Sequence, residues 1–330
     1  MVVPLRVRGG PPARARLPGG SLDAGRLRPR AQRRRPARNR DLDPGPGRAR
    51  RLRPAGAADS FVVRRGSNRR AVIAGYPGQE ERSRDTLIAL PGLCLVTGRH
   101  EDAKKILRAF AKSLSLEPTL IDASLWFFVA SWRYSQATGD EAFVRETLLP
   151  ALRKVKVGEN GFLEGNLEVS ALWVNALAIL ADLEARLGDP EEAKRLTQAS
   201  KRAQKSFVEA FRNEERPEQI FALSLPFPVL PKPKAARWLA EIEEKVRERA
   251  DLLGPYLTAL ARVHGAAGRK KGLAAVEALK PRLAEMGVGS EAWSVAELLR
   301  AYVEDLRGGE KPIRKKAAGP AAKRRGKKEA

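Results

Sequence analysis

Residues 81–114 read ERSRDTLIALPGLCLVTGRHEDAKKILRAFAKSL and place two helical patterns in direct succession. After the charged pair Arg84 and Asp85 the sequence is almost wholly apolar as far as Val96, and Gly98 is a typical residue at the end of a helix. A second helical pattern starts immediately afterwards. The stretch therefore predicts two helices, over 85–96 and 101–114, joined by a tight hairpin.

The same rhythm continues along the chain. A helix is expected over 122–138, ending at Gly139, and Asp140 is a suitable cap for a helix that runs on to residue 152. A helix over 168–187 stops at Gly188, and Pro190 opens a long charged helix to about residue 213. Further helices are expected over 218–225, 234–249, 251–264, 271–285 and 291–306. About eleven helices, mostly in antiparallel pairs, predict an all-α fold.

Helical hairpins stack either into an open solenoid or into a closed, double-layered α/α barrel. A solenoid shows a residue pattern that recurs at a fixed period, and this sequence has none. The segments 125–129 and 171–180 are apolar nearly all round, as inner helices would be, whereas 190–212 and 234–249 are amphipathic. The pattern favours the closed barrel.

Positive charge is concentrated at the two ends. The net charge is +24, of which residues 1–58, with 16 Arg and three Asp, contribute +13, and residues 310–330 contribute +7. Both ends are basic and contain few apolar residues, so we expect disordered tails over 1–58 and 308–330 that flank a folded region over 59–307.

Two interpretations of the tails are open. Arginines and lysines contact nucleic-acid phosphates without sequence preference, but neither tail has an aromatic residue that would stack on a base. The first 58 residues contain no lysine at all, a bias that also arises when a GC-rich gene is translated upstream of its true start or in a shifted frame. The nucleotide sequence decides this second interpretation.

Composition excludes several classes of protein. No apolar run has the length of a membrane span, and the arginine-rich start lacks the apolar core of a secretory signal, so we expect a cytoplasmic protein without membrane contact. Cys94 has no partner for a disulfide, and His100 and His264 supply little material for a metal site. Neither a metal nor a cofactor is expected.

Several runs resemble the C-terminal glucosidase domain of glycogen debranching enzymes, the amylo-α-1,6-glucosidases. They include AGYPGQEERSRDTLIALPGLCLVTGR at 74–99, IDASLWFFVASWRYSQATGD at 121–140 and LEVSALWVNALAILADLEARLG at 167–188. Others are RPEQIFALSLPFPVL at 216–230, GPYLTALARVHG at 254–265 and EAWSVAELLRAY at 291–302. They follow the family's order, and the resemblance implies an (α/α)6 barrel of the glucoamylase type and a branched α-glucan such as glycogen as the partner.

The resemblance also implies a sugar-binding pocket. Arg84 and Asp85 match an Arg-Asp pair that holds the terminal glucose, and a carboxylate beside a guanidinium suits a polyol. Asp122, Trp126 and Glu168 match residues that line the same pocket. From the residues alone, Asp85 and Asp122 are equally helix caps, Trp126 a core residue and Glu168 a helix-start carboxylate.

The sequence departs from the family in its loops. Glycoside hydrolysis by inversion needs a carboxylic acid and a carboxylate base. The family's acid lies in a Thr-Trp-Met-Asp run that has no counterpart in GFLEGNLEVSALW at 161–173, where Glu164 is the nearest carboxylate. Glu291 is the candidate base. The chain thus resembles an abridged domain with its helices retained and its active-site loops shortened.

Three functions follow from these observations. The first is an α-1,6-glucosidase of glycogen catabolism, a glycoside hydrolase. The second is a catalytically inactive remnant that at most binds glucan. The third is anion or nucleic-acid binding through the basic tails, which predicts binding that weakens steeply with salt and is lost when the tails are removed.

Overall fold

The computed structural model describes residues 60–65, 69–76, 81–114, 121–155, 157, 166–212, 216–283 and 289–308. All of them belong to the compact unit of residues 51–330. The expected tails over 1–58 and 308–330 lie outside the described residues, except for Gly308.

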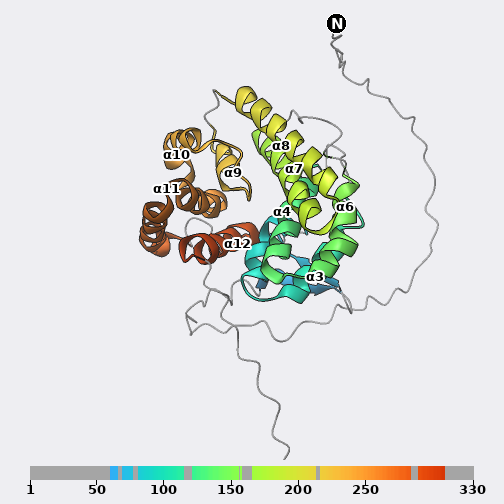
Figure 1. Cartoon of the computed structure of the whole chain (residues 1–330). Coiled ribbons are helices and arrows are strands. Elements are labelled where there is room, and N and C mark those ends of the chain that lie inside the picture. The colour runs from blue at the N-terminus through green and yellow to red at the C-terminus, as the bar shows by residue number, and fades with distance from the viewer. Residues whose placement is uncertain are drawn as a thin grey trace, which may run out of the picture. The chain divides into compact units, whose positions relative to one another are not determined.

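Six helices of the described residues form an inner ring (Figure 1). Each contacts the next along the chain, and the last contacts the first, so the ring is closed. In order they are α2 (Ser83–Leu90), α4 (Ile121–Thr138), α7 (Leu167–Leu187), α9 (Gln219–Ser224), the first half of α11 (Ala250–Leu279) and α12 (Ala292–Arg300). The wider helical segments η1 (Pro91–Leu95) and η4 (Ala301–Leu306) extend α2 and α12.

A second layer returns the chain from the end of one inner helix to the start of the next. It consists of α3 (His100–Phe110), the series α5 (Glu141–Phe143), η2 (Val144–Leu148) and α6 (Leu149–Arg153), then α8 (Pro190–Ala210), α10 (Lys232–Val246) and the second half of α11 with the short turn η3 (Lys280–Arg282). The prediction of an all-α, double-layered barrel is confirmed.

Local sequence sets the turns between the two layers. Gly98 and Gly139 have φ angles of 77° and 62°, in the left-handed region that favours glycine, so the helices before them end there. Asp140 caps α5, its Oδ1 accepting from the backbone N–H of Phe143 at 3.2 Å. At Gly265, φ is 58° and ψ is −128°, which separates the two halves of α11. The helices predicted over 251–264 and 271–285 are these two halves.

A short β-hairpin precedes the barrel and was not predicted. Strand β1 (Val62–Arg65) pairs antiparallel with β2 (Arg69–Val72), Val62 opposite Val72. Each strand has four residues and half of them are arginines, so neither shows a clear apolar alternation. Beyond the hairpin, Gly75 forms an isolated bridge with Glu291 at the start of α12.

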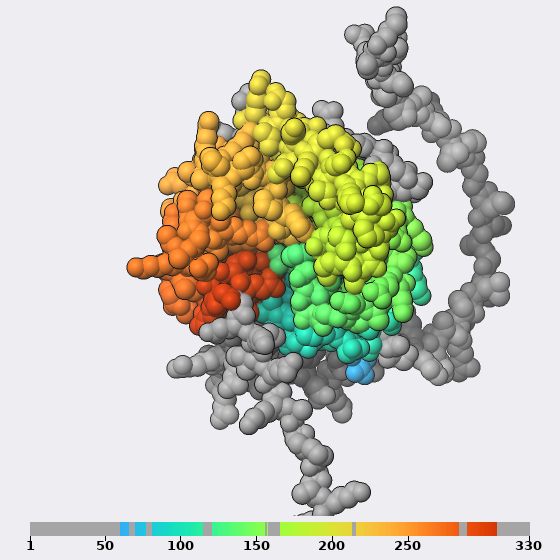
Figure 2. All heavy atoms as spheres, in the orientation of Figure 1, coloured from blue at the N-terminus to red at the C-terminus, as the bar shows by residue number. Residues whose placement is uncertain are grey.

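The ring closes tightly around α12. A Cβ atom added at Gly92 in η1 would lie 1.9 Å from the carbonyl oxygen of Ala296, and one at Gly254 in α11 would lie 2.4 Å from the carbonyl carbon of Glu297. Backbones approach this closely only where one residue lacks a side chain. In Figure 2 the red residues of the last helices lie directly against the blue-green residues of the first ones.

Candidate functional site

The first turns of three inner helices hold acidic residues. They are Asp85 on α2, Asp122 on α4 and Glu168 on α7. Because each outer helix carries the chain back, successive inner helices run parallel and begin at the same end of the ring. This end also presents the positive ends of the helix dipoles, which stabilise carboxylates there.

Arg84 joins these helices. Its Nη2 donates to Oε1 of Glu168 at 2.6 Å, and its Nε lies 3.6 Å from Oδ2 of Asp122. Its Nη1 lies 3.8 Å from Oδ1 of Asp85, beyond hydrogen-bond distance. The guanidinium carbon stacks 4.6 Å from the ring centroid of Trp293 on α12. One cation therefore lies among three carboxylates and an aromatic face.

Asp85 retains unused hydrogen-bonding capacity. Its side chain is 18% exposed, and the nearest charged group, Nη1 of Arg84, lies 3.8 Å away. Burial raises the pKa of this carboxyl above its ordinary value, against the opposing influence of Arg84 and Arg82. A ligand hydroxyl that donates to Asp85 would therefore meet an acceptor that is already partly dehydrated.

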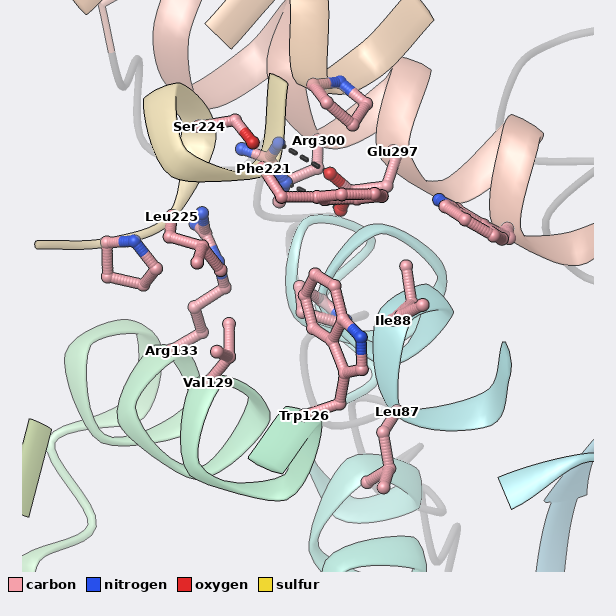
Figure 3. Close-up of a pocket in the computed structure, with 14 residues that line it drawn as sticks. Leu87, Ile88, Trp126, Val129, Arg133, Phe221, Ser224, Leu225, Glu297 and Arg300 are labelled. Carbon is pink, nitrogen blue, oxygen red and sulfur yellow. Dashed lines mark hydrogen bonds and ion pairs between the residues drawn. The ribbon is translucent and has the colours of Figure 1, made fainter. Parts of the chain in front are cut away.

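Trp126 connects the acidic group to an aromatic row. Its Nε1 donates to Oε1 of Glu168 at 3.0 Å, the same oxygen that accepts from Arg84. Its ring meets Phe221 edge-on at 5.9 Å between centroids, and Phe221 lies 6.2 Å from Trp293. In Figure 3 Trp126 and Phe221 point toward each other from α4 and α9. The row of aromatic side chains lies inside the ring of inner helices.

The row lines one side of a small cavity, with Arg133, Glu297 and Arg300 among the other lining residues. Its volume is about 10 Å³, roughly that of one water molecule. The cavity is too small for a sugar ring.

Glu291 lies at the edge of this arrangement. It is the exposed residue that precedes α12, two residues before Trp293. The backbone around it pairs with residues 74–76, with Ala292 N donating to Ala74 O and Tyr76 N donating to Ser290 O, both at 2.9 Å. The ladder fixes the backbone of Glu291 and leaves its carboxylate facing solvent.

The chemistry of the site suits a neutral polyol. Its carboxylates accept hydrogen bonds, its guanidinium donates them, and the partly exposed ring of Trp293 adds apolar surface. The excess of negative charge over the single Arg84 would stabilise positive charge developing on a sugar ring. Among the described residues there is no group of three His, Cys, Asp or Glu arranged to hold a metal ion.

The five residues predicted to bind substrate come together in the structure: Arg84, Asp85, Asp122, Trp126 and Glu168. Glu164 lies outside the described residues. The sequence did not assign Phe221 or Trp293 to this site. The available signal for Trp293 was its place in the first turn of an inner helix, beside the candidate base.

Comparison with known proteins gives one family match. The family model of the amylo-alpha-1,6-glucosidases matches residues 56–159, which include Arg84, Asp85, Asp122 and Trp126. The resemblance predicted from the sequence is confirmed for this part of the chain. A search of curated proteins found no match.

A solved structure supports the fold. A rhamnosidase from Klebsiella oxytoca with rhamnose bound superimposes with a TM-score of 0.52 at 17% sequence identity. The similarity covers 66% of this chain and 57% of the rhamnosidase chain. At this identity the likeness concerns the fold, and with the family match it identifies a glycoside hydrolase-like helical domain. None of the helices in the described residues combines the length and the apolar character of a membrane span.

Proposed function

We propose that this domain binds the terminal α-1,6-linked glucose of a branched α-glucan such as glycogen and acts as an amylo-α-1,6-glucosidase. The observation that carries the proposal is the position of Arg84 between Glu168, Asp122 and Trp293. Asp85 is available beside it to accept a hydroxyl of the sugar. In this proposal Glu291 is the base that activates water.

The small size of the cavity supports binding of a single terminal unit at the acidic first turns. Trp126 and Phe221 are buried and the cavity beside them has room for about one water molecule, so in this proposal the glucose contacts Arg84 and Asp85 and the rest of the glucan extends into solvent.

The test is glucose release from glycogen whose branches have been trimmed to single α-1,6-linked glucose units, together with isomaltose binding measured by calorimetry. Arg84→Gln is expected to weaken isomaltose binding about 10-fold or more, since hydrogen bonds to charged groups contribute about 1.5–3 kcal/mol. Arg186→Gln is the matched control, because Arg186 is also ion-paired, with Asp182, at the opposite end of α7. Equal affinities for the two variants would contradict the proposal.

A second candidate, glucan binding without hydrolysis, is favoured by a separate observation. Asn166 caps α7, its Oδ1 accepting from Val169 N at 2.9 Å, so the helix starts immediately after the segment in which the family's acid would lie. If the unaltered chain releases glucose and the Glu291→Gln variant does not, the hydrolase is supported. Glycogen binding by the folded chain without any release supports the second candidate.

A further inference from the structure

The guanidinium of Arg84 is held from two sides. Glu168 and Asp122 attract its nitrogens from α7 and α4, and the indole of Trp293 lies against its face from α12. A carboxylate fixes the in-plane position of a guanidinium, whereas an aromatic face fixes the tilt of its plane. Trp293 thus supplies a restraint that the acidic residues do not.

Packing alone does not explain a tryptophan at this position. The Nε1–H of Trp293 is buried and has no hydrogen-bond acceptor among the described residues. Trp126 and Trp132, in contrast, donate to Glu168 and Asp182. An unpaired buried N–H costs free energy, and phenylalanine would fill much of the same space without that cost. What tryptophan adds over phenylalanine is the stronger π-face for a cation.

The contacts form a closed cycle. Arg84 and Trp126 both donate hydrogen bonds to Glu168. The ring of Trp126 contacts Phe221, and Phe221 in turn lies near Trp293. The indole of Trp293 stacks on the guanidinium of Arg84, which closes the cycle. The five residues come from α2, α7, α4, α9 and α12. Arg84 therefore contacts two members of the cycle directly, Glu168 and Trp293.

We propose that Trp293 is a positioning residue of the sugar site, which holds the guanidinium of Arg84 in the orientation that meets the bound glucose. The inference rests on the proposed function and deepens it. Trp293 acts through Arg84, so its contribution to affinity exists only while Arg84 is present.

The test compares Trp293→Leu with Trp238→Leu, using isomaltose affinity and circular dichroism. Trp238 is a matched control because it is buried and carries a cation, Lys234 at 5.6 Å, but lies in the outer layer on α10. Trp293→Leu is expected to weaken isomaltose binding about 3- to 30-fold. Trp238→Leu lowers stability and leaves the affinity unchanged. If Trp293→Leu does not fold, Trp293→Phe is compared with Trp238→Leu instead, and its isomaltose affinity is expected to fall about twofold or more.

A double-mutant cycle separates positioning from general damage. In the Arg84→Gln background, measured with branched glucan at high concentration, the effect of Trp293→Leu is expected to fall below about twofold. The same fold-loss in both backgrounds would overturn the positioning role. Absence of binding by the unaltered folded chain would overturn the proposed function as well, so the two failures are distinguishable.

Discussion

At the scale of single residues, the charged pair at the start of α2 is costly to the fold. Arg84 and Asp85 open a helix whose next five residues are all buried. Asp85 is only 18% exposed and lacks a close hydrogen-bond donor among the described residues, so its ionised form is poorly solvated. A residue kept at such a cost is better explained by a ligand than by the stability of the helix.

Asp85→Asn is expected to raise stability at neutral pH and to weaken isomaltose binding about 10-fold or more. Burial raises the pKa of Asp85 in the folded chain above its unfolded value, so the ionised carboxylate destabilises the fold at neutral pH. This destabilisation disappears as the pH falls through the raised folded pKa. Urea unfolding across a pH series is the measurement, and the gain from Asp85→Asn should shrink on the acid side.

The control for this pH series is Glu277→Gln. Glu277 is an exposed carboxylate paired with Lys280 at the far end of α11, away from the acidic first turns. It should leave both stability and sugar affinity nearly unchanged. A stability loss in Asp85→Asn at neutral pH would show that the carboxylate supports the fold.

At the scale of elements, α12 fits between two neighbours through glycine contacts. Gly92 of η1 and Gly254 of α11 approach consecutive residues of α12, Ala296 and Glu297. Because the groups they meet belong to the backbone, a side chain at either glycine displaces the whole helix.

Gly92→Ala is expected to lower the free energy of unfolding by about 1–3 kcal/mol or more, because its Cβ would lie 1.9 Å from a carbonyl oxygen. Gly272→Ala, in the second half of α11, is the matched control. There the added Cβ meets the end of the flexible Leu306 side chain at 2.6 Å, so a smaller loss is expected. Thermal unfolding of both variants measures these losses of stability. Equal losses in the two variants would contradict the close approach of α12 to Gly92.

The elements differ in how well the sequence predicts them. Helices α4 and α7 have long apolar runs bounded by caps and glycines, so their boundaries follow from local chemistry. The β-hairpin escaped prediction because its four-residue strands carry too little alternation. The contact of Trp293 with Arg84 could not be predicted from the sequence, because the two residues lie at opposite ends of the barrel sequence and only the closed ring brings them together.

At the scale of the whole molecule, buried charges help to close the ring. Arg300 is 1% exposed and donates to Glu297, Asp305 and Thr258, as the dashed lines to Glu297 in Figure 3 show in part. From α4, Arg133 donates to Glu304 of η4 at 2.6 Å. The network ties α4, α11, α12 and η4 together at a depth where an unpaired charge is costly.

Arg300→Met is expected to lower the free energy of unfolding by about 3–5 kcal/mol, because it leaves Glu297 and Asp305 without their buried partner. Urea unfolding at neutral pH measures the loss. A change below about 1 kcal/mol would show that water or another cation replaces the guanidinium.

The same network predicts sensitivity to acid. Burial by itself raises the pKa of Asp305, but Arg300, Arg133 and Arg262 and the hydrogen bond from Thr258 outweigh it, so the pKa lies below its ordinary value. Ionised Asp305 therefore stabilises the fold above its unfolded pKa, and this contribution is lost as the pH falls through the folded pKa. In the Arg300→Met variant, the stability contributed by ionised Asp305 should begin to be lost at a higher pH than in the unaltered chain.

The contact of α12 with α2 has a consequence for the order of events during synthesis. A ribosome makes the chain from its N-terminus, so Arg84 emerges long before Trp293. Until α12 has left the exit tunnel, Arg84 has its acidic neighbours but lacks the contact with Trp293. The barrel is then still open between α2 and α11, the first and fifth inner helices. A nascent chain therefore completes the contacts around Arg84 in a single late step, when the last inner helix enters the ring.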